Sequence, residues 1–188
     1  FRENFILPLS HDEVVHGIPS DKRIIKEGDI VSLDAGVIYK GYHSDAARTY
    51  PVGKISKEAQ QLIDVTKQSF FEGIKMAKAG NHLYDISNAI DAYVSQFGYG
   101  IVRDLVGHGI GTSLHEDPQV PNFRQKRRGM KLLPGMTLAV EPMINMGRAD
   151  VEWLDDGMDC IHNIWIEHHR LIAKLWIKTS ISKSNTKN

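Results

Sequence analysis

The sequence predicts an α+β domain with a mostly antiparallel, curved sheet and helices on its outer face. Strand-like segments come in pairs, two helical segments follow one another between the pairs, and a turn signal joins the first pair. Because strands and helices do not alternate regularly, a parallel sheet of βαβ units is not expected. In such a sheet, polar side chains from separate strands converge on the concave face.

The first strand pair is predicted from two segments rich in β-branched and apolar residues. Asp29–Tyr39 and Tyr42–Val52 flank Lys40-Gly41, which is a turn signal. The two segments therefore form a hairpin or meander.

Two helices are predicted next. Ser56 is a good N-cap for a helix that runs to about Ala79, and Gly80 suits its C-terminal cap. A second helix runs from Tyr84 to Phe97, and Gly98 ends it. Apolar residues recur at helical spacing in both segments.

The remaining segments predict short strands and one long loop. Val106–Gly111 is too rich in glycine for a helix, so it is a strand end or a loop. Residues 121–136 contain many basic residues and predict a surface loop. Thr137–Glu141 is a short apolar strand that Pro142 closes.

Composition narrows the functional classes. The 188 residues suffice for one domain, and 41% of them are hydrophobic, which supports a packed core. The formal net charge is zero and argues against a general nucleic-acid footprint. The single cysteine, Cys160, excludes a disulfide framework and fits a reducing compartment. No segment has membrane-spanning length, and the start at Phe1, without a signal-peptide pattern, suggests an N-terminal truncation.

Two aspartates in the hairpin predict a metal site. Asp34 lies inside the apolar run 30–38, where an unpaired carboxylate is expensive to bury, and Asp45 follows on the second strand. We expect the two residues to face each other directly across the hairpin. Two like charges at such positions destabilise a sheet unless a cation lies between them.

Four further residues carry weaker signals. His108 lies between two glycines, and Glu141 ends an apolar strand, so both are candidate metal ligands. His16 and His115 stand beside apolar residues and are candidate hydrogen-bond donors to an oxyanion. Taken singly, each of the four is explained as well by a structural histidine or a solvated carboxylate.

The segments around these residues resemble bacterial type I methionine aminopeptidases. The resemblance covers roughly residues 12–157 and rests on six motifs: His16–Pro19, Gly41–Thr49, Val106–Gly111, Leu114–Pro121, Leu133–Met136 and Val140–Met143. Type II enzymes carry a long insertion before their last catalytic strands, whereas here only 33 positions separate His108 from Glu141.

The resemblance implies a pita-bread (creatinase/aminopeptidase-like) fold for a catalytic domain over residues 1–157. It also implies a site with two divalent metal ions, which are cobalt, manganese, iron or zinc. Asp34 and Asp45 would bridge the ions, His108 would hold one of them, and Glu141 would be a further ligand that also takes a proton.

The resemblance also implies roles for the two remaining histidines. His115 would stabilise the tetrahedral oxyanion, and His16 would contact the peptide nitrogen, so both would bind substrate. The implied enzyme is a cytoplasmic monomer that removes methionine from the N-termini of nascent polypeptides with a small second residue. Association with the ribosome is compatible with this role, and no membrane is involved.

The resemblance stops at Gly157. The family continues with Trp-Thr-Val, whereas this chain reads Met158-Asp159-Cys160. The codons ATG GAY TGY, shifted by one base, can encode Trp-Thr-Val, so a frameshift at position 158 is inferred. Residues 158–188 are then a non-family tail that is out of frame.

Several consequences follow from the frameshift. The last bridging glutamate is missing near Ile172, and Glu167, His168 and His169 lie in an unrelated context. Met158 replaces the tryptophan of the substrate pocket. We expect the tail to be frayed rather than to form a core strand, and the activity of this chain to be low.

Two alternatives stay open from the sequence. A related Xaa-Pro dipeptidase shares the fold, although such enzymes usually carry a large N-terminal domain. A non-catalytic pita-bread binding module would tolerate the missing ligand, although such modules usually lose several.

Overall fold

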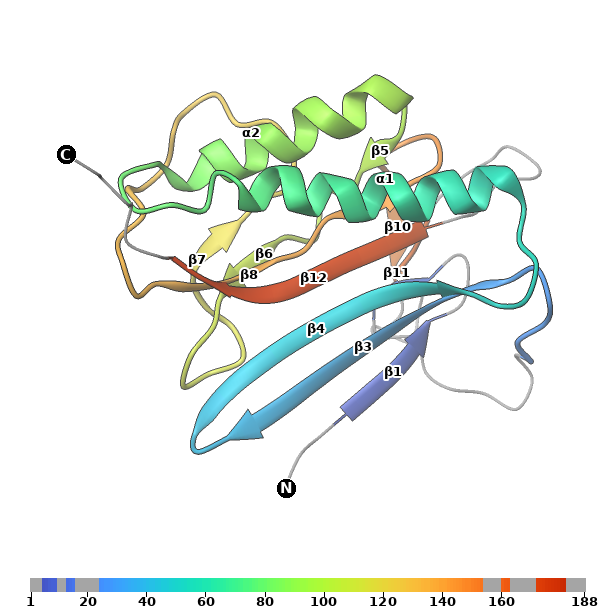
Figure 1. The fold of residues 1–188 in the computed structure, drawn as a ribbon, viewed down its shortest axis with the longest axis horizontal. Coiled ribbons are helices and arrows are strands. Elements are labelled where there is room, and N and C mark those ends of the chain that lie inside the picture. The colour runs from blue at the N-terminus through green and yellow to red at the C-terminus, as the bar shows by residue number, and fades with distance from the viewer. Residues whose placement is uncertain (1–4, 10–12, 16–23, 154–159, 163–171, 182–188) are drawn as a thin grey trace.

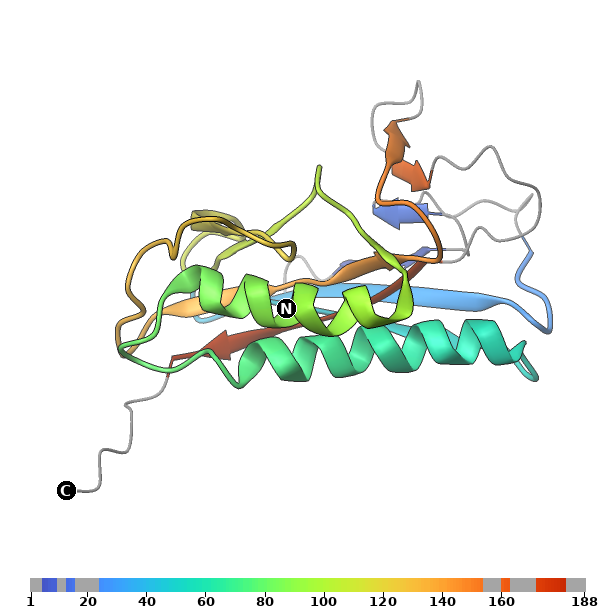
Figure 2. The ribbon, with the colours of Figure 1, turned by 90° about the horizontal axis from the view of Figure 1, so that it is seen from above.

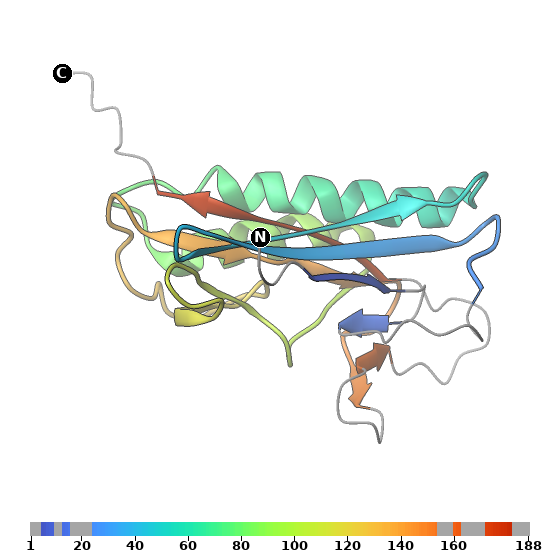
Figure 3. The same ribbon diagram turned by 90° about the horizontal axis from the view of Figure 1, so that it is seen from below.

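The computed structural model describes residues 5–9, 13–15, 24–153, 160–162 and 172–181. A nine-stranded sheet lies at the centre, and both helices cover one of its faces (Figure 1). A small three-stranded sheet projects from the opposite side, as the views from above and below agree (Figures 2 and 3). All strand pairs between the described residues are antiparallel, which confirms the predicted fold class.

The first hairpin forms as the sequence predicts. Strands β3 (Ile30–Tyr39) and β4 (Tyr42–Pro51) are joined at Lys40 and Gly41, whose φ angles are 51° and 79°. Positive φ at both central residues is the signature of the tight turn that matches the twist of a hairpin. The turn pairs Tyr39 with Tyr42 and thereby fixes the register of the whole hairpin.

The other strands are short. The large sheet has the order β1-β3-β4-β12-β8-β6-β7, and β9 pairs with β12 and β5. Its remaining members are β1 (Phe5–Leu9), β5 (Gly100–Ile101), β6 (Gly107–Gly109), β7 (Glu116–Val120), β8 (Thr137–Val140), β9 (Met143–Asn145) and β12 (Ile172–Ser180). The small sheet comprises β2 (Glu13–Val15), β10 (Val151–Trp153) and β11 (Cys160–His162).

The expectation of a frayed tail is wrong for β12. This strand lies in the middle of the large sheet and pairs with β4 on one side and with β8 and β9 on the other. The lysines of the segment suggested a solvated tail, but Ile172, Leu175, Trp176 and Ile177 favour a strand. Without β12, the facing edges of β4 and β8 would lack hydrogen-bond partners, which is costly in a sheet interior.

Both helices end earlier than the sequence predicts. Helix α1 (Lys57–Ile74) begins at Ser56, whose Oγ accepts the Ala59 N–H at 3.0 Å, and the chain then forms tight turns instead of helix up to Ala79. Helix α2 (Leu83–Val94) passes into the 3-10 turn η1 (Ser95–Phe97), and Gly98 ends it at φ 70°. Among the described residues, neither helix is long and apolar enough to cross a membrane.

Two apolar clusters lie on opposite faces of the large sheet. The larger one joins the helices to side chains such as Leu138, Val140 and Ile144. The smaller one contains Ala47 and Met143 and packs against the small sheet. Because side chains alternate along a strand, residues in phase with Ala47 and Met143 face away from the helices.

Candidate metal centre

Three candidate ligands converge on the face away from the helices. Donor atoms of Asp45, His108 and Glu141 all lie within 4.8 Å of one another. His108 Nε2 lies 3.0 Å from Glu141 Oε1 and 3.7 Å from Asp45 Oδ2. The three residues are only 9%, 7% and 7% exposed, so water screens their charges weakly.

Strand pairing explains why residues so distant in sequence meet. His108 of β6 pairs with Ala139 of β8, and Glu141 lies two residues beyond Ala139 on the same face. Asp45 has the same orientation on β4 as Ala47, which belongs to the cluster on that face. The site therefore depends on a sheet that brings together three separate strands, β4, β6 and β8.

The His108 ring is oriented for metal binding. Its Nδ1 lies 2.8 Å from the Gly109 carbonyl oxygen, a contact in which Nδ1 carries the proton. Nε2 then faces the two carboxylates, and its lone pair would be available to a metal ion bound between them. A backbone or carboxylate partner of this kind orients most histidine ligands of metals.

The pKa of His108 reports the electrostatic field of the site. Burial by itself would lower this pKa, but the hydrogen bond and charge of Glu141, with smaller contributions from Gly109 and Asp45, raise it above the ordinary value. The carboxylates thus stabilise positive charge at Nε2. A divalent cation bound there would be stabilised by the same field, and the set of two carboxylates and one imidazole fits cobalt, manganese, iron or zinc.

The glycines that flank His108 are required by close strand packing. A Cβ atom on Gly107 would overlap the carbonyl oxygen of Ala139, and one on Gly109 would overlap that of Asp117. Strand β6 can therefore approach β7 and β8 closely only with glycine at both positions. This packing places the backbone of His108 deep in the sheet.

Asp34 and Asp45 are not direct partners, contrary to our prediction. The register pairs Asp34 with Ala47 and Gly36 with Asp45. The sequence identified the turn correctly, but the pairing must be counted outward from Tyr39 and Tyr42, which offsets the two aspartates by two residues. They still share one face as diagonal neighbours, and among the described residues the three-ligand cluster does not include Asp34.

Asn122 is a site residue that the sequence did not reveal. The sequence predicts a surface loop at this position, but Asn122 is fully buried, and its Nδ2 donates a 2.7 Å hydrogen bond to the carbonyl oxygen of Glu141. Since Pro142 follows and lacks an N–H, this bond holds the peptide from which the Glu141 side chain departs. The sequence signal that could have indicated the burial of Asn122 is its position directly after the apolar pair Val120-Pro121.

We expect Asn122→Ala to weaken metal binding about 10- to 100-fold, the usual effect of removing a partner that orients a ligand. The loss also leaves a buried carbonyl without its donor, at about 1–3 kcal/mol of stability. Asn88→Ala is the matched control, because Asn88 accepts a backbone N–H of Gln125 outside the cluster. Calorimetric titration with Mn²⁺ and thermal unfolding measure both effects. Unchanged metal affinity in Asn122→Ala would rule out the positioning role.

Of the other two histidines, the structure places one. His115 is exposed, and its ring centroid lies 4.2 Å from that of His108, so it borders the cluster. His16 lies outside the described residues, as do Met158, Glu167, His168 and His169.

The register of β12 also changes the position at which the missing bridging glutamate, expected near Ile172, could reach the cluster. Ile172 pairs with Asn145, beyond the cluster, whereas Trp176 pairs with Ala47 and Lys178 pairs with Ala139. Ala47 is the partner of Asp34, and Ala139 is the partner of His108. A carboxylate from β12 would therefore have to come from position 176 or 178, about 13 Å or more along the strand from 172. Neither residue is acidic.

The profile of metallopeptidase family M24 matches residues 6–174. The chain belongs to metallopeptidase family M24. Methionine aminopeptidase from Clostridium acetobutylicum is 58% identical over 137 residues, which make up 73% of this chain and 55% of that protein. Methionine aminopeptidase 1 from Bacillus subtilis is 46% identical over 160 residues, or 81% of this chain and 64% of the relative. This M24 chain therefore spans less than two thirds of these relatives.

Solved structures agree with the family assignment. The crystal structure of methionine aminopeptidase from Thermotoga maritima has a TM-score of 0.88 and 39% identity, covering 95% of this M24 chain and 70% of that one. The Xaa-Pro dipeptidase from Bacillus anthracis has a TM-score of 0.69 and 26% identity, covering 94% and 44%. The pita-bread fold is thereby confirmed, and the higher similarity is to methionine aminopeptidases.

Proposed function

We propose that the protein to which this chain belongs is a methionine aminopeptidase that removes N-terminal methionine from nascent polypeptides with a small second residue. The observation that carries the proposal is the buried cluster of Asp45, His108 and Glu141 in a chain of family M24. Similarity to methionine aminopeptidases favours them over Xaa-Pro dipeptidases.

In this proposal, Asp45, His108 and Glu141 hold divalent metal, and Asp34 contributes from its diagonal position on the same face. Bound metal would supply Lewis acidity and activate a water molecule. Glu141 also accepts a proton during the reaction, a role that the burial of its carboxylate beside His108 supports. His115, at the exposed rim, donates a hydrogen bond to the developing oxyanion, and His16 contacts the peptide nitrogen.

The proposal extends to two metal ions and to a cytoplasmic, monomeric enzyme. The carboxylates of Asp34 on β3 and Asp45 on β4 lie on one face of the sheet and supply oxygen ligands for a second ion. The single cysteine supports intracellular action. The similarity to methionine aminopeptidases supports nascent N-termini as the partners of the enzyme.

Substrate preference tests the proposed activity. In a version whose reading frame is restored after Gly157, Met-Ala and Met-Gly peptides should release methionine. Met-Lys and Met-Phe peptides should react at least about 100-fold more slowly, because a site that fits a small second residue would exclude a large one by steric overlap. Release of free methionine, measured by mass spectrometry at several metal concentrations, gives kcat/KM. Equal values for small and large second residues would refute the specificity, and cleavage of Xaa-Pro peptides would favour the dipeptidase instead.

A further inference from the structure

The loop between β6 and β7 carries His115 to the rim of the metal centre. It comprises residues 110–115, because β6 ends at Gly109, which pairs with Glu116 at the start of β7. His115 is the last residue of this loop, and its ring contacts that of His108. A hydrogen-bond donor in such a place is effective only if it is held to within about 1 Å of the productive position. The groups that fix this loop therefore bear on the proposed reaction.

The carboxylate of Glu116 turns back onto the loop that precedes it. Its Oε1 accepts the backbone N–H of Ser113 at 2.8 Å and the hydroxyl of Thr112 at 3.2 Å. The bond from the Ser113 N–H lowers the pKa of Glu116 below its ordinary value. Thr112 and the charge of His43 add to this effect, and burial opposes it. The carboxylate is therefore ionised near neutral pH and is a strong acceptor for both groups.

A glycine makes room for this carboxylate. A Cβ atom on Gly111 would lie 2.9 Å and 3.0 Å from the two carboxylate oxygens of Glu116, which is closer than carbon and oxygen normally approach. Glycine at position 111 thus allows the carboxylate to lie against the loop backbone and to reach Ser113.

Neighbouring strands fix the start of the same loop. The Thr137 hydroxyl on β8 donates to the Ile110 carbonyl oxygen, and the Ile110 N–H donates to the Thr137 carbonyl oxygen at 3.2 Å. On β4, the N–H of His43 donates to the Gly111 carbonyl oxygen at 2.7 Å. The carboxylate of Glu116 then fixes the residues that follow, up to the one that precedes Leu114.

We propose that Glu116 is a positioning residue that holds His115 beside the metal centre. Its bond to the Ser113 N–H closes a ring of chain that contains His115, and a closed ring leaves the enclosed backbone few other conformations. The inference rests on the proposed role of His115 and extends it to a residue that itself need not touch substrate.

The kinetic test uses a Met-Ala peptide and the version with its reading frame restored after Gly157. Glu116→Ala should lower kcat about 10- to 100-fold and change KM less than about threefold, because a misplaced donor weakens transition-state stabilisation and leaves ground-state binding intact. Glu116→Gln keeps a side-chain oxygen as acceptor and should keep kcat within about threefold of the parent value. In the double variant His115→Ala/Glu116→Ala, kcat should be no lower than in His115→Ala alone.

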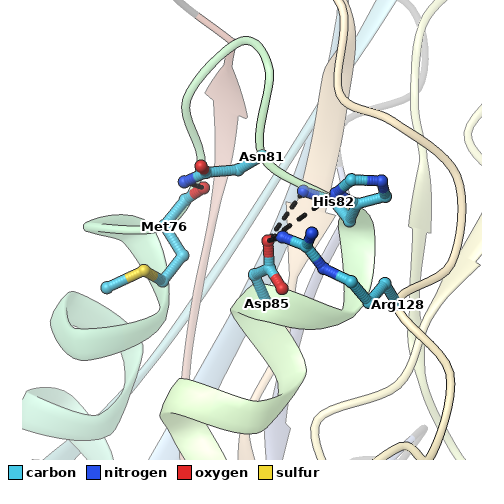
Figure 4. Close-up of polar contacts among 5 residues, drawn as sticks. All are labelled: Met76, Asn81, His82, Asp85 and Arg128. Carbon is cyan, nitrogen blue, oxygen red and sulfur yellow. Dashed lines mark hydrogen bonds and ion pairs between the residues drawn. The ribbon is translucent and has the colours of Figure 1, made fainter.

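Asp85 supplies the matched control, because it makes the same kind of bond elsewhere. Its Oδ2 accepts the backbone N–H of His82, three residues earlier, at 2.9 Å, and lies 2.9 Å from Arg128 Nη2 (Figure 4). Asp85 belongs to the first turn of α2, outside the metal centre. Asp85→Ala should therefore lower the thermal stability and leave kcat unchanged.

Two further measurements on the metal-free protein do not require activity. In Glu116→Ala, hydrogen exchange of the Ser113 amide should be at least about tenfold faster, whereas Asp85→Ala should leave it unchanged. The nuclear Overhauser effect between the ring protons of His108 and His115 should weaken in Glu116→Ala. Gly111→Ala displaces the carboxylate without removing it, and it should produce the same two changes.

Several results would overturn the proposal. They are a parent-like kcat in Glu116→Ala, additive losses in the double variant with His115→Ala, a kcat in Glu116→Gln as low as in Glu116→Ala, and unchanged exchange of the Ser113 amide. If the version with the restored frame released no methionine, the proposed function would fail instead. The amide exchange and the contact between the two rings would then still decide the role of Glu116.

Discussion

Restoring the reading frame after Gly157 is expected to raise turnover of a Met-Ala peptide by about 100-fold or more over the chain with its present sequence. Among the described residues, the cluster contains two carboxylates and one imidazole. The β12 residues that pair with the strand positions beside the cluster are Trp176 and Lys178. Two-metal hydrolases need carboxylates that hold both ions. A chain with a lysine or tryptophan at these positions has fewer ligands and less negative charge at the site.

The measurement compares kcat/KM of both versions at saturating Mn²⁺ or Co²⁺, with metal content determined on the same samples. Thermal unfolding serves as the control, because β12 is a central strand and its sequence also affects stability. Comparable turnover by two equally folded versions would show that the C-terminal break does not matter, and the frameshift inference would be withdrawn. The division of the chain at Gly157 stays a prediction until that experiment.

Replacing His108 by alanine is expected to weaken binding of the first metal ion by at least about 100-fold, beyond the effect of losing a partner that only orients a ligand. The imidazole supplies the single nitrogen ligand of the cluster, and its Nε2 lies within 4 Å of both carboxylates. Its removal also takes away the ring that lies between the carboxylates of Asp45 and Glu141, so the stability of the metal-free protein should fall as well.

Calorimetric titration with Mn²⁺ and the visible absorption spectrum of bound Co²⁺ measure this prediction. His82→Ala is the matched control, since His82 lies at the start of α2, outside the cluster. Asp34→Asn should weaken the first ion less than His108→Ala does, because Asp34 occupies a diagonal position. Metal affinity that is equal in His108→Ala and in the native chain would exclude the cluster as the first metal site.

Local signals in the sequence were sufficient for the hairpin and for the helix starts. Ser56 forms the cap that its side chain predicts, and Lys40-Gly41 forms the predicted turn, because both depend on a few neighbouring residues. The helix ends depend on contacts outside the local sequence. The segment after Ile74 bonds to the loop near Leu132 and to its own last turn, contacts that no local pattern reveals.

The sequence also determined which residues are ligand candidates, because an acidic or imidazole side chain inside an apolar strand needs a partner wherever that strand lies. Only the tertiary structure decided which candidates meet. The pairing of β6 with β8 brings His108 to Glu141, the hairpin register sets Asp34 two residues away from Asp45, and burial turns Asn122 from a loop residue into a support for Glu141. These are contacts between distant segments, and side-chain alternation makes their outcome depend on a register that composition and spacing do not specify.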